Sequence, residues 1–294
     1  SDLRLKAKPK PPPEDGMESR STTVEGVRMR WEEQGEGLPV VLIHGIPTNP
    51  GVWRHMVPLV RYARCLAWEM VGYGLSIPQG RGRDISVARQ AEYLAAWLTA
   101  YGIEKAVLVG HDLGGGVAQV MAVRHRERVA GLVLVNAVCY DSWPIPRVRL
   151  MRALGGLVEK LPNPFLWPAF AQLILQGHDQ WRRGWESLPV HWGPYARGDA
   201  AEALVRQVRA LDPEDTLAVA GRLPELRLPA RLVWGAADEF QKIEYGDRLA
   251  GDLAAPIDLV PGARHFVPED HPERVAAAIE ELLRELRLPA AGTA

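Results

Sequence analysis

The sequence predicts an α/β protein with a mostly parallel sheet that is flanked by helices and interrupted by a helical insertion. Short apolar runs alternate with helix-like segments before residue 137 and after residue 229. Between those points, several helix-like segments occur without a convincing buried strand. A Gly-x-Asp-x-Gly turn also joins an apolar run to a helix of small residues. Strands that alternate with helices are typical of a parallel sheet covered on both faces.

The first part of the chain, residues 21–136, supplies most of the predicted sheet. Residues 21–33 have the pattern of two short strands that turn at Glu25-Gly26. Uninterrupted apolar runs of strand length predict strands buried on both faces. These runs lie at residues 39–43, 65–68, 106–109 and 129–135, with helices expected near 53–61, after a capping Asp84, and over 114–126.

The alternation resumes after the insertion. Strands are predicted at residues 230–234 and 256–260, and helices near 244–250 and over 271–287. Residues 21–136 and 230–294 are therefore expected to form one core domain, with residues 137–229 inserted. An insertion that follows the carboxyl end of a strand lies over the sheet edge where α/β proteins bind ligands. We expect it to act as a helical cap (lid), and it carries Trp143, Trp167, Trp181, Trp185 and Trp192.

Composition excludes several classes of function. The 35 basic and 36 acidic residues leave a formal net charge of −1, whereas nucleic-acid binders need a field of one sign. An apolar content of 47% is enough for a large buried core. The two cysteines, Cys65 and Cys139, lack the spacing of a zinc site or a disulfide scaffold.

The amino-acid sequence also lacks the patterns expected of targeting signals. No apolar stretch approaches the roughly 18 residues needed to span a bilayer, and the first residues do not resemble a secretory signal. We therefore expect a cytoplasmic protein without membrane contact. Residues 1–20 are rich in lysine and proline and are expected to form a flexible N-terminal arm. The sequence leaves the oligomeric state open.

Residues 108–115, Leu-Val-Gly-His-Asp-Leu-Gly-Gly, carry the most chemical information. Gly110 and Gly114 stand two residues before and after Asp112, and this spacing permits a tight turn from strand to helix. Such a turn lifts the central side chain above the sheet and places it against N–H groups at the helix start. The pattern is a nucleophile elbow with Asp in the usual place of Ser. Taken alone, Asp112 could also be simply a helix N-cap.

Three further segments favour the catalytic interpretation. His44-Gly-Ile-Pro47 follows a predicted strand, so the N–H of Ile46 can join that of Leu113 in an oxyanion hole. Asp238 and His265 each follow the end of a later strand. Each of these residues alone could be an ordinary loop residue. Together they give the order nucleophile, acid and histidine, all at carboxyl ends of strands.

These segments resemble the α/β-hydrolase family, and within it the branch with an Asp nucleophile, which contains epoxide hydrolases and haloalkane dehalogenases. The resemblance covers residues 21–136 and 230–294, whereas the insertion matches only in place and length. It implies an α/β-hydrolase fold with an inserted cap. The residues that carry it are His44-Gly-Ile-Pro47, Gly72-Tyr-Gly-Leu-Ser76, Gly110-His-Asp-Leu-Gly114, Asp238 and His265.

An aspartate nucleophile determines the type of reaction. Attack of a carboxylate on an ester would give a reactive anhydride, whereas attack on a saturated carbon with a leaving group gives an alkyl-enzyme ester. His265, oriented by Asp238, would then activate water to hydrolyse that ester, with the Ile46 and Leu113 N–H groups holding the oxyanion. This scheme requires no metal and no organic cofactor.

The residues around the elbow favour an epoxide over a halide. Haloalkane dehalogenases of the usual kind have a halide-binding Trp directly after the nucleophile, where this chain has Leu113, and Ile46 replaces their Asn. The arginines of fluoroacetate dehalogenases are also missing, since Leu113, Gly115 and Gly116 stand near the elbow. With the low net charge and the tryptophan-rich cap, this predicts hydrolysis of a small, neutral, apolar epoxide. A haloalkane dehalogenase with the same triad is the alternative.

Epoxide opening needs a proton donor, which in this family is generally a pair of cap tyrosines. The insertion offers Tyr140 and Tyr195, neither at a spacing that matches the family pattern. His178 or His191 could replace one of them. A third hypothesis is a non-catalytic homologue that binds a small apolar ligand, which the complete set of Asp112, Asp238 and His265 disfavours.

Overall fold

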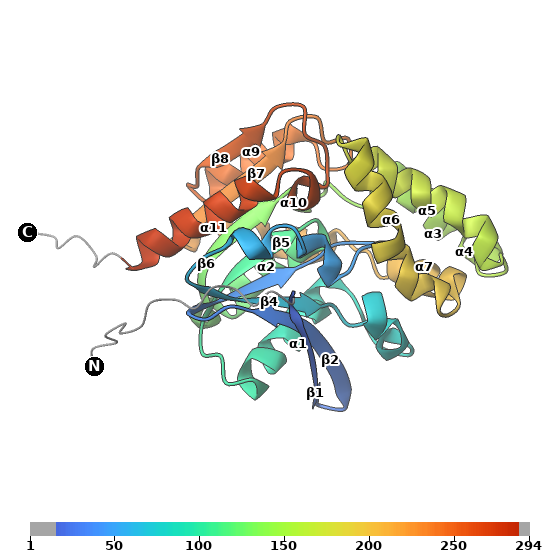
Figure 1. The fold of residues 1–294 in the computed structure, drawn as a ribbon, viewed down its shortest axis with the longest axis horizontal. Helices are drawn as coiled ribbons and strands as arrows, with labels where there is room; N and C mark the ends of the chain where they lie inside the picture. The colour runs from blue at the N-terminus through green and yellow to red at the C-terminus, as the bar shows by residue number, and fades with distance from the viewer. Residues whose placement is uncertain (1–15, 288–294) are drawn as a thin grey trace, which may run out of the picture.

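The computed structural model describes residues 16–287, which form an eight-stranded sheet in the order β1-β2-β4-β3-β5-β6-β7-β8 (Figure 1). β2 pairs antiparallel with β1 and β4, and all later pairs are parallel. This confirms the predicted mostly parallel sheet. The strands are β1 Glu18–Val24, β2 Val27–Gln34, β3 Leu38–Ile43, β4 Ala63–Glu69, β5 Ala106–His111, β6 Val129–Val135, β7 Ala230–Gly235 and β8 Ile257–Val260.

Helices cover both faces of this sheet, as predicted. The central strands β3 and β6 are apolar at every position because successive side chains point to opposite faces, and both faces are buried. In β3, Val41 and Ile43 pack in one core cluster, whereas Val40 and Leu42 pack in the other. The first cluster includes α1 (Val87–Ala100), α2 (Leu113–Arg124) and α9 (Ile243–Asp252), and the second includes α10 (Val267–Asp270) and α11 (Pro272–Arg287).

Two boundaries differ from the prediction. β1 begins at Glu18, inside the predicted arm of residues 1–20, and residues 1–15 lie outside the described part of the chain. The N-cap of α1 is Ser86 rather than Asp84, because the Ser86 hydroxyl accepts the N–H of Arg89. The side chain of Asp84 instead accepts the N–H of Ser86, the residue that caps α1.

The predicted helix near residues 53–61 is wrong. The structure has two short 3₁₀ turns there, η1 Pro50–Trp53 and η2 Val57–Leu59. Pro50 and Pro58 lie in the first turn of these elements, where a missing backbone N–H leaves no hydrogen bond unmade. Within one continuous α-helix over residues 53–61, Pro58 would remove a backbone hydrogen bond, which explains why such a helix does not form. The interruption leaves Arg54 between the two turns, facing the helical segment between β6 and β7.

That segment contains six helices and projects beyond one side of the sheet (Figure 1). It contacts loops that follow β3 and β4: Asn49 donates to the carbonyl of Val190 at 2.9 Å, and Gln207 donates to that of Gly72 at 2.9 Å. That residues 137–229 form a separate cap domain with these boundaries stays a prediction. The helices are α3 Pro146–Ala153, α4 Gly155–Val158, α5 Asn163–Gly177, α6 Trp181–Ala196, α7 Ala200–Arg209 and α8 Glu214–Ala220. Between residues 16 and 287, no helix is long and apolar enough to cross a membrane.

A buried carboxylate in α10 joins α6 to the core. Glu269 is fully buried and accepts from Arg54 at 2.7 Å, from His191 at 2.7 Å, and from the hydroxyl of Ser187. Burial alone would raise the pKa of this carboxyl, but His191 and Arg54 lower it to about 2. Glu269 therefore stabilises the contact between α6 and the loop after β3 mainly as an anion.

Replacement Glu269→Gln keeps the size of the side chain but removes its charge. Because the folded-state pKa is depressed from 4.5, the stabilisation is present above 4.5 and is lost as pH falls toward about 2. We expect the variant to lose about 3 kcal/mol of unfolding free energy near neutral pH. Denaturant unfolding near neutral pH and again near pH 3 measures the free energy of unfolding of the variant and of the original chain. The difference between these two free energies should be smaller at the lower pH.

Glu281→Gln provides the matched control. Glu281 forms only an exposed pair with Arg231 at 3.7 Å, which contributes little. Equal stability of the Glu269→Gln variant and the original chain at neutral pH would contradict the anchoring role.

Candidate active site

Asp112 stands on a strained turn between β5 and α2. Its φ of 51° lies in the left-handed region, which residues other than glycine rarely adopt. The turn is possible only because its flanks are glycines: a Cβ on Gly110 would collide with the backbone of Gly114, and one on Gly114 with the carbonyl of Ile43. The Asp112 side chain forms no capping hydrogen bond with α2, so the helix N-cap alternative is not supported.

The carboxylate is held from the loop after β3. The N–H of Ile46 donates to Oδ2 of Asp112 at 2.9 Å. β3 and β5 are neighbours in the sheet, which brings this loop beside the elbow. Burial raises the pKa of Asp112, opposed by His265 and by the N–H groups of Ile46 and Leu113. Both N–H groups predicted for an oxyanion hole thus lie against the carboxylate.

His265 and Asp238 complete the predicted group. Nδ1 of His265 lies 2.8 Å from Oδ2 of Asp238, and its Nε2 lies 3.8 Å from Oδ1 of Asp112. Burial lowers the pKa of His265, but Asp238 and then Asp112 outweigh it, so the net shift is upward. The structure therefore brings together the three residues that the sequence places at the ends of separate strands.

Asn136 orients Asp238 and was missed by the sequence reasoning. Its amide donates to Oδ2 of Asp238 at 2.6 Å, and its Oδ1 accepts from the N–H of Gly235 at 3.2 Å. The N–H of Phe240 donates to the other oxygen of Asp238 at 2.7 Å. A polar residue directly after the apolar run 129–135 was the available signal.

Two further histidines support the site in their neutral forms. His111 donates Nε2–H to the carbonyl of His265 at 3.0 Å, and burial holds its pKa well below the usual value. His44 accepts the N–H of Met70 through Nε2 at 3.1 Å, and burial lowers its pKa to about 3. Both rings position backbone next to the reacting groups and carry no charge of their own.

The structure places the two predicted donor tyrosines differently. Tyr140 donates its hydroxyl to Asp252 of α9 at 2.6 Å, and this proton is therefore not directed to Asp112. Tyr195 is buried in α6 and donates to Oε1 of Gln207 at 2.8 Å. Tyr195 thus faces the helices and loops above the sheet, whereas Tyr140 is directed toward α9.

The histidines proposed as substitutes for a tyrosine are paired with carboxylates of α10. His178 lies 2.8 Å from Asp270, and His191 lies 2.7 Å from Glu269. Both pairs are fully buried. These contacts explain the two rings as parts of the junction that joins α10 to the end of α5 (His178) and to α6 (His191).

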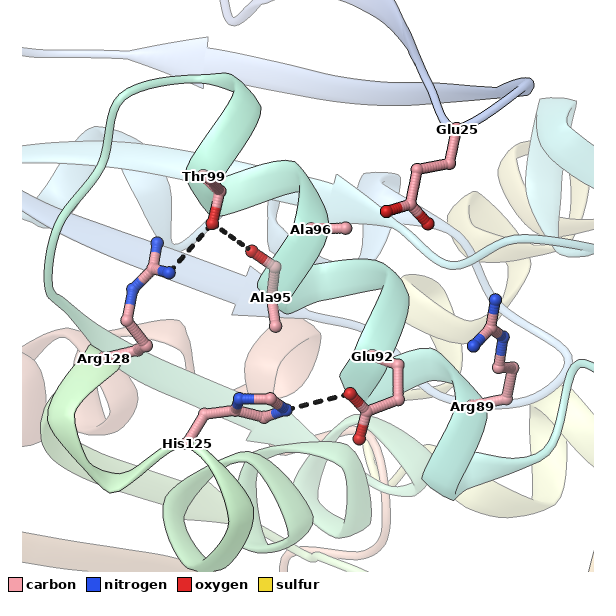
Figure 2. Close-up of a pocket in the computed structure, with 8 residues that line it drawn as sticks. All are labelled: Glu25, Arg89, Glu92, Ala95, Ala96, Thr99, His125 and Arg128. Atoms are coloured by element: carbon pink, nitrogen blue, oxygen red, sulfur yellow. Dashed lines mark hydrogen bonds and ion pairs between the residues drawn. The ribbon is translucent and has the colours of Figure 1, made fainter.

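A separate surface hollow lies beside α1 and contains no member of the triad (Figure 2). Four of its polar side chains are paired: His125 lies 3.0 Å from Glu92, and Arg128 donates to Thr99 at 2.9 Å. Within residues 16–287, no group of three or more His, Cys, Asp or Glu side chains is arranged to hold a metal. The group around Asp112 remains the candidate active site.

Comparison with known proteins agrees with this geometry. The chain is 28% identical to haloalkane dehalogenase 2 of Mycobacterium bovis over 86% of this chain and 91% of that protein. It is 29% identical to a haloalkane dehalogenase of Mesorhizobium japonicum over 88% of this chain and 89% of that protein. An α/β hydrolase fold protein from Burkholderia ambifaria superimposes with a TM-score of 0.81, at 27% identity, over 89% and 97% of the two chains. The α/β hydrolase fold model matches residues 39–272, and the chain therefore belongs to this family and is a hydrolase.

Proposed function

We propose that the protein is an epoxide hydrolase that opens a small, neutral, apolar epoxide to a vicinal diol. One observation carries the proposal: a buried aspartate stands on the elbow, with a backbone N–H on one oxygen and a histidine beside the other. A carboxylate in this position is suited to displacement at a saturated carbon. The covalent intermediate is an alkyl ester of Asp112.

The two carboxylate oxygens have different roles in the first step. Oδ2 of Asp112 is engaged by the N–H of Ile46, whereas Oδ1 faces Nε2 of His265. Oδ1 therefore attacks the epoxide carbon, and Oδ2 becomes the carbonyl oxygen of the ester. The N–H groups of Ile46 and Leu113 are then already placed for the oxyanion that forms on Oδ2 during hydrolysis.

Formation of the ester prepares His265 for the second step. The Asp112 charge is one of the contributions that raise the pKa of His265, and alkylation removes it. His265 then loses its proton more readily and accepts one from the water that attacks Cγ of Asp112. Asp238, fixed by Asn136, stabilises the resulting imidazolium.

The side chains beside the nucleophile favour oxygen over halide as the leaving atom. Leu113 and Ile46 are apolar and offer no side-chain N–H to a departing halide. The names of the two haloalkane dehalogenase relatives favour the alternative, which would use the same triad. A non-catalytic ligand-binding role is the third candidate.

The compartment is part of the same proposal. Cys65 and Cys139 are both buried and free. Free thiols are the usual state in a reducing cytoplasm, which supports the predicted cytoplasmic location.

Two substrates separate the candidate functions. Incubation with styrene oxide should give the diol, and incubation with 1-bromobutane should release little bromide. Bromide release without diol formation would overturn the epoxide assignment. Failure of both reactions, with a ligand-dependent rise in melting temperature, would favour the non-catalytic role.

Substitutions of the nucleophile and the base should stop the reaction at different stages. We expect Asp112→Asn to reduce diol formation by at least about 1000-fold, because an amide cannot replace the carboxylate nucleophile. His265→Gln should form the ester but hydrolyse it slowly, so that intact-mass spectra show an adduct of substrate mass. Absence of an adduct with both substrates would count against the covalent scheme.

The rate of ester hydrolysis should depend on the protonation of His265. Asp238 raises the pKa of His265 above 6.5, and the base must be neutral, so hydrolysis should slow as pH falls through that raised value. Asp238→Asn should move this acid limb to lower pH and also lower the plateau rate. Quenched-flow mass spectrometry of the adduct measures both. An acid limb that does not move in the variant would show that another group titrates.

A further inference from the structure

The phenol of Tyr73 is the feature of the site that the triad does not explain. Tyr73 follows β4 and is only 1% exposed. Its ring meets the ring of His44 edge-on, with centroids 5.9 Å apart. Its hydroxyl has no hydrogen-bond partner among residues 16–287, and the hydroxyl oxygen is not one of the fully buried unpaired atoms, so it keeps some accessible surface.

The loop around Tyr73 is rigid. The Tyr73 N–H donates to the carbonyl of Met70 at 3.1 Å, and its own carbonyl accepts from Ser76 at 2.8 Å. The buried carboxylate of Glu69 accepts from the hydroxyl of Ser76 at 2.7 Å and the N–H of Leu75 at 3.0 Å. A side chain on so constrained a backbone keeps its position without further cost during a reaction.

The strand order places this loop on the same sheet edge as the nucleophile, with only the loop after β3 between them. β4 neighbours β3, and β3 neighbours β5, so the loops with Tyr73, Ile46 and Asp112 follow adjacent parallel strands. His44 links the first two loops through its bond with Met70. Burial raises the pKa of Tyr73, and the charges of Tyr195 and Asp112 act in the same direction, so its phenol is held in the neutral form.

Tyr195, in α6, is linked to the same loop through Gln207, and its hydroxyl has a hydrogen-bond acceptor. Gln207 donates to the carbonyl of Gly72 at 2.9 Å and accepts the hydroxyl proton of Tyr195 at 2.8 Å. The Tyr195 proton is therefore committed to Gln207, whereas the Tyr73 proton has no acceptor. Of these two phenols, Tyr73 is the one whose hydroxyl has no acceptor among residues 16–287.

We propose that Tyr73 is the catalytic acid that protonates the epoxide oxygen as Asp112 opens the ring. This assignment rests on the proposed epoxide hydrolase function and names a donor in the core rather than in the cap. A neutral phenol suits the task because it carries no charge before reaction, and an alkoxide is a stronger base than a phenolate.

The proposed sequence balances in atoms and charge. Oδ1 of Asp112 bonds to the epoxide carbon, the carbon–oxygen bond of the ring breaks, and the released oxygen takes the Tyr73 proton. Water then gives one proton to His265 and adds its oxygen to Cγ of Asp112. Collapse expels the diol, whose second oxygen takes the remaining water proton. His265 finally returns its proton to the Tyr73 phenolate, so the net reaction adds one water to the epoxide.

Single-turnover experiments in the His265→Gln background separate ester formation from hydrolysis. With styrene oxide, Tyr73→Phe should slow ester formation by roughly 100-fold or more, measured by intact mass after quenching. The slow loss of adduct after removal of substrate should be unchanged. A merely structural role of Tyr73 would alter both steps, or the melting temperature.

Two further proteins complete the test. Tyr195→Phe removes the phenol whose proton is already committed, and ester formation should stay within about 5-fold of the parent. Incorporation of 3-fluorotyrosine at position 73 keeps the shape but strengthens the acid, and should accelerate ester formation without altering hydrolysis. This second variant keeps the proposal testable if Tyr73→Phe folds poorly.

The outcomes distinguish the two levels of proposal. Ester formation at the parent rate in Tyr73→Phe would overturn the assignment of the acid and leave the epoxide hydrolase function intact. Absence of diol with the unmodified chain would overturn the function, and the assignment of Tyr73 with it.

Discussion

The left-handed backbone of Asp112 is the constraint on which the rest of the site depends. A conformation of this kind costs of order 1–3 kcal/mol and persists only where the surroundings determine it. Here the surroundings are the glycines on either side, and a carbonyl of Asp112 that accepts N–H groups from Gly115 at 2.9 Å and Val138 at 3.1 Å. The turn therefore ties β5 to α2 and to the chain that leaves β6. Ile46 and His265 both meet the carboxylate that this turn presents.

Two aspartates in one buried site have different environments, and the difference separates their roles. Asp238 accepts hydrogen bonds from His265, Asn136 and the N–H of Phe240, so its oxygens are fully engaged. Asp112 receives one well-defined bond from Ile46 and leaves Oδ1 facing His265 at 3.8 Å, longer than a hydrogen bond. The oxygen with fewest partners is the better nucleophile, because fewer bonds must break for it to attack. The different hydrogen bonding of the two aspartates thus supports the proposed roles, with Asp112 as nucleophile and Asp238 as orienting acid, without reference to their order in the chain.

The sequence predicted the features that depend on local pattern. Apolar runs of strand length predict the strands of the sheet, and the glycines around Asp112 predict the elbow. Both can be predicted because each pattern is contained within a few consecutive residues. The contacts of Asn136 and His111, and the proposed role of Tyr73, could not be predicted because they depend on which strands become neighbours. Tyr140 was proposed as a donor from its place in the insertion, but it bonds to Asp252, which lies 112 residues away in sequence. No local signal could reveal that contact.

The junction between α6 and the core also bears on the catalytic histidine. Glu269 lies four residues after His265, on the short helix α10. Between them, the ring of Phe266 stacks on His178 and lies against His265, and its N–H donates to Gly177 at the end of α5. Because α10 is short, a shift of α6 that broke the Glu269 contacts would also disturb the segment that carries His265. The buried ion pairs at α10 therefore stabilise the position of the proposed base as well as that of α6.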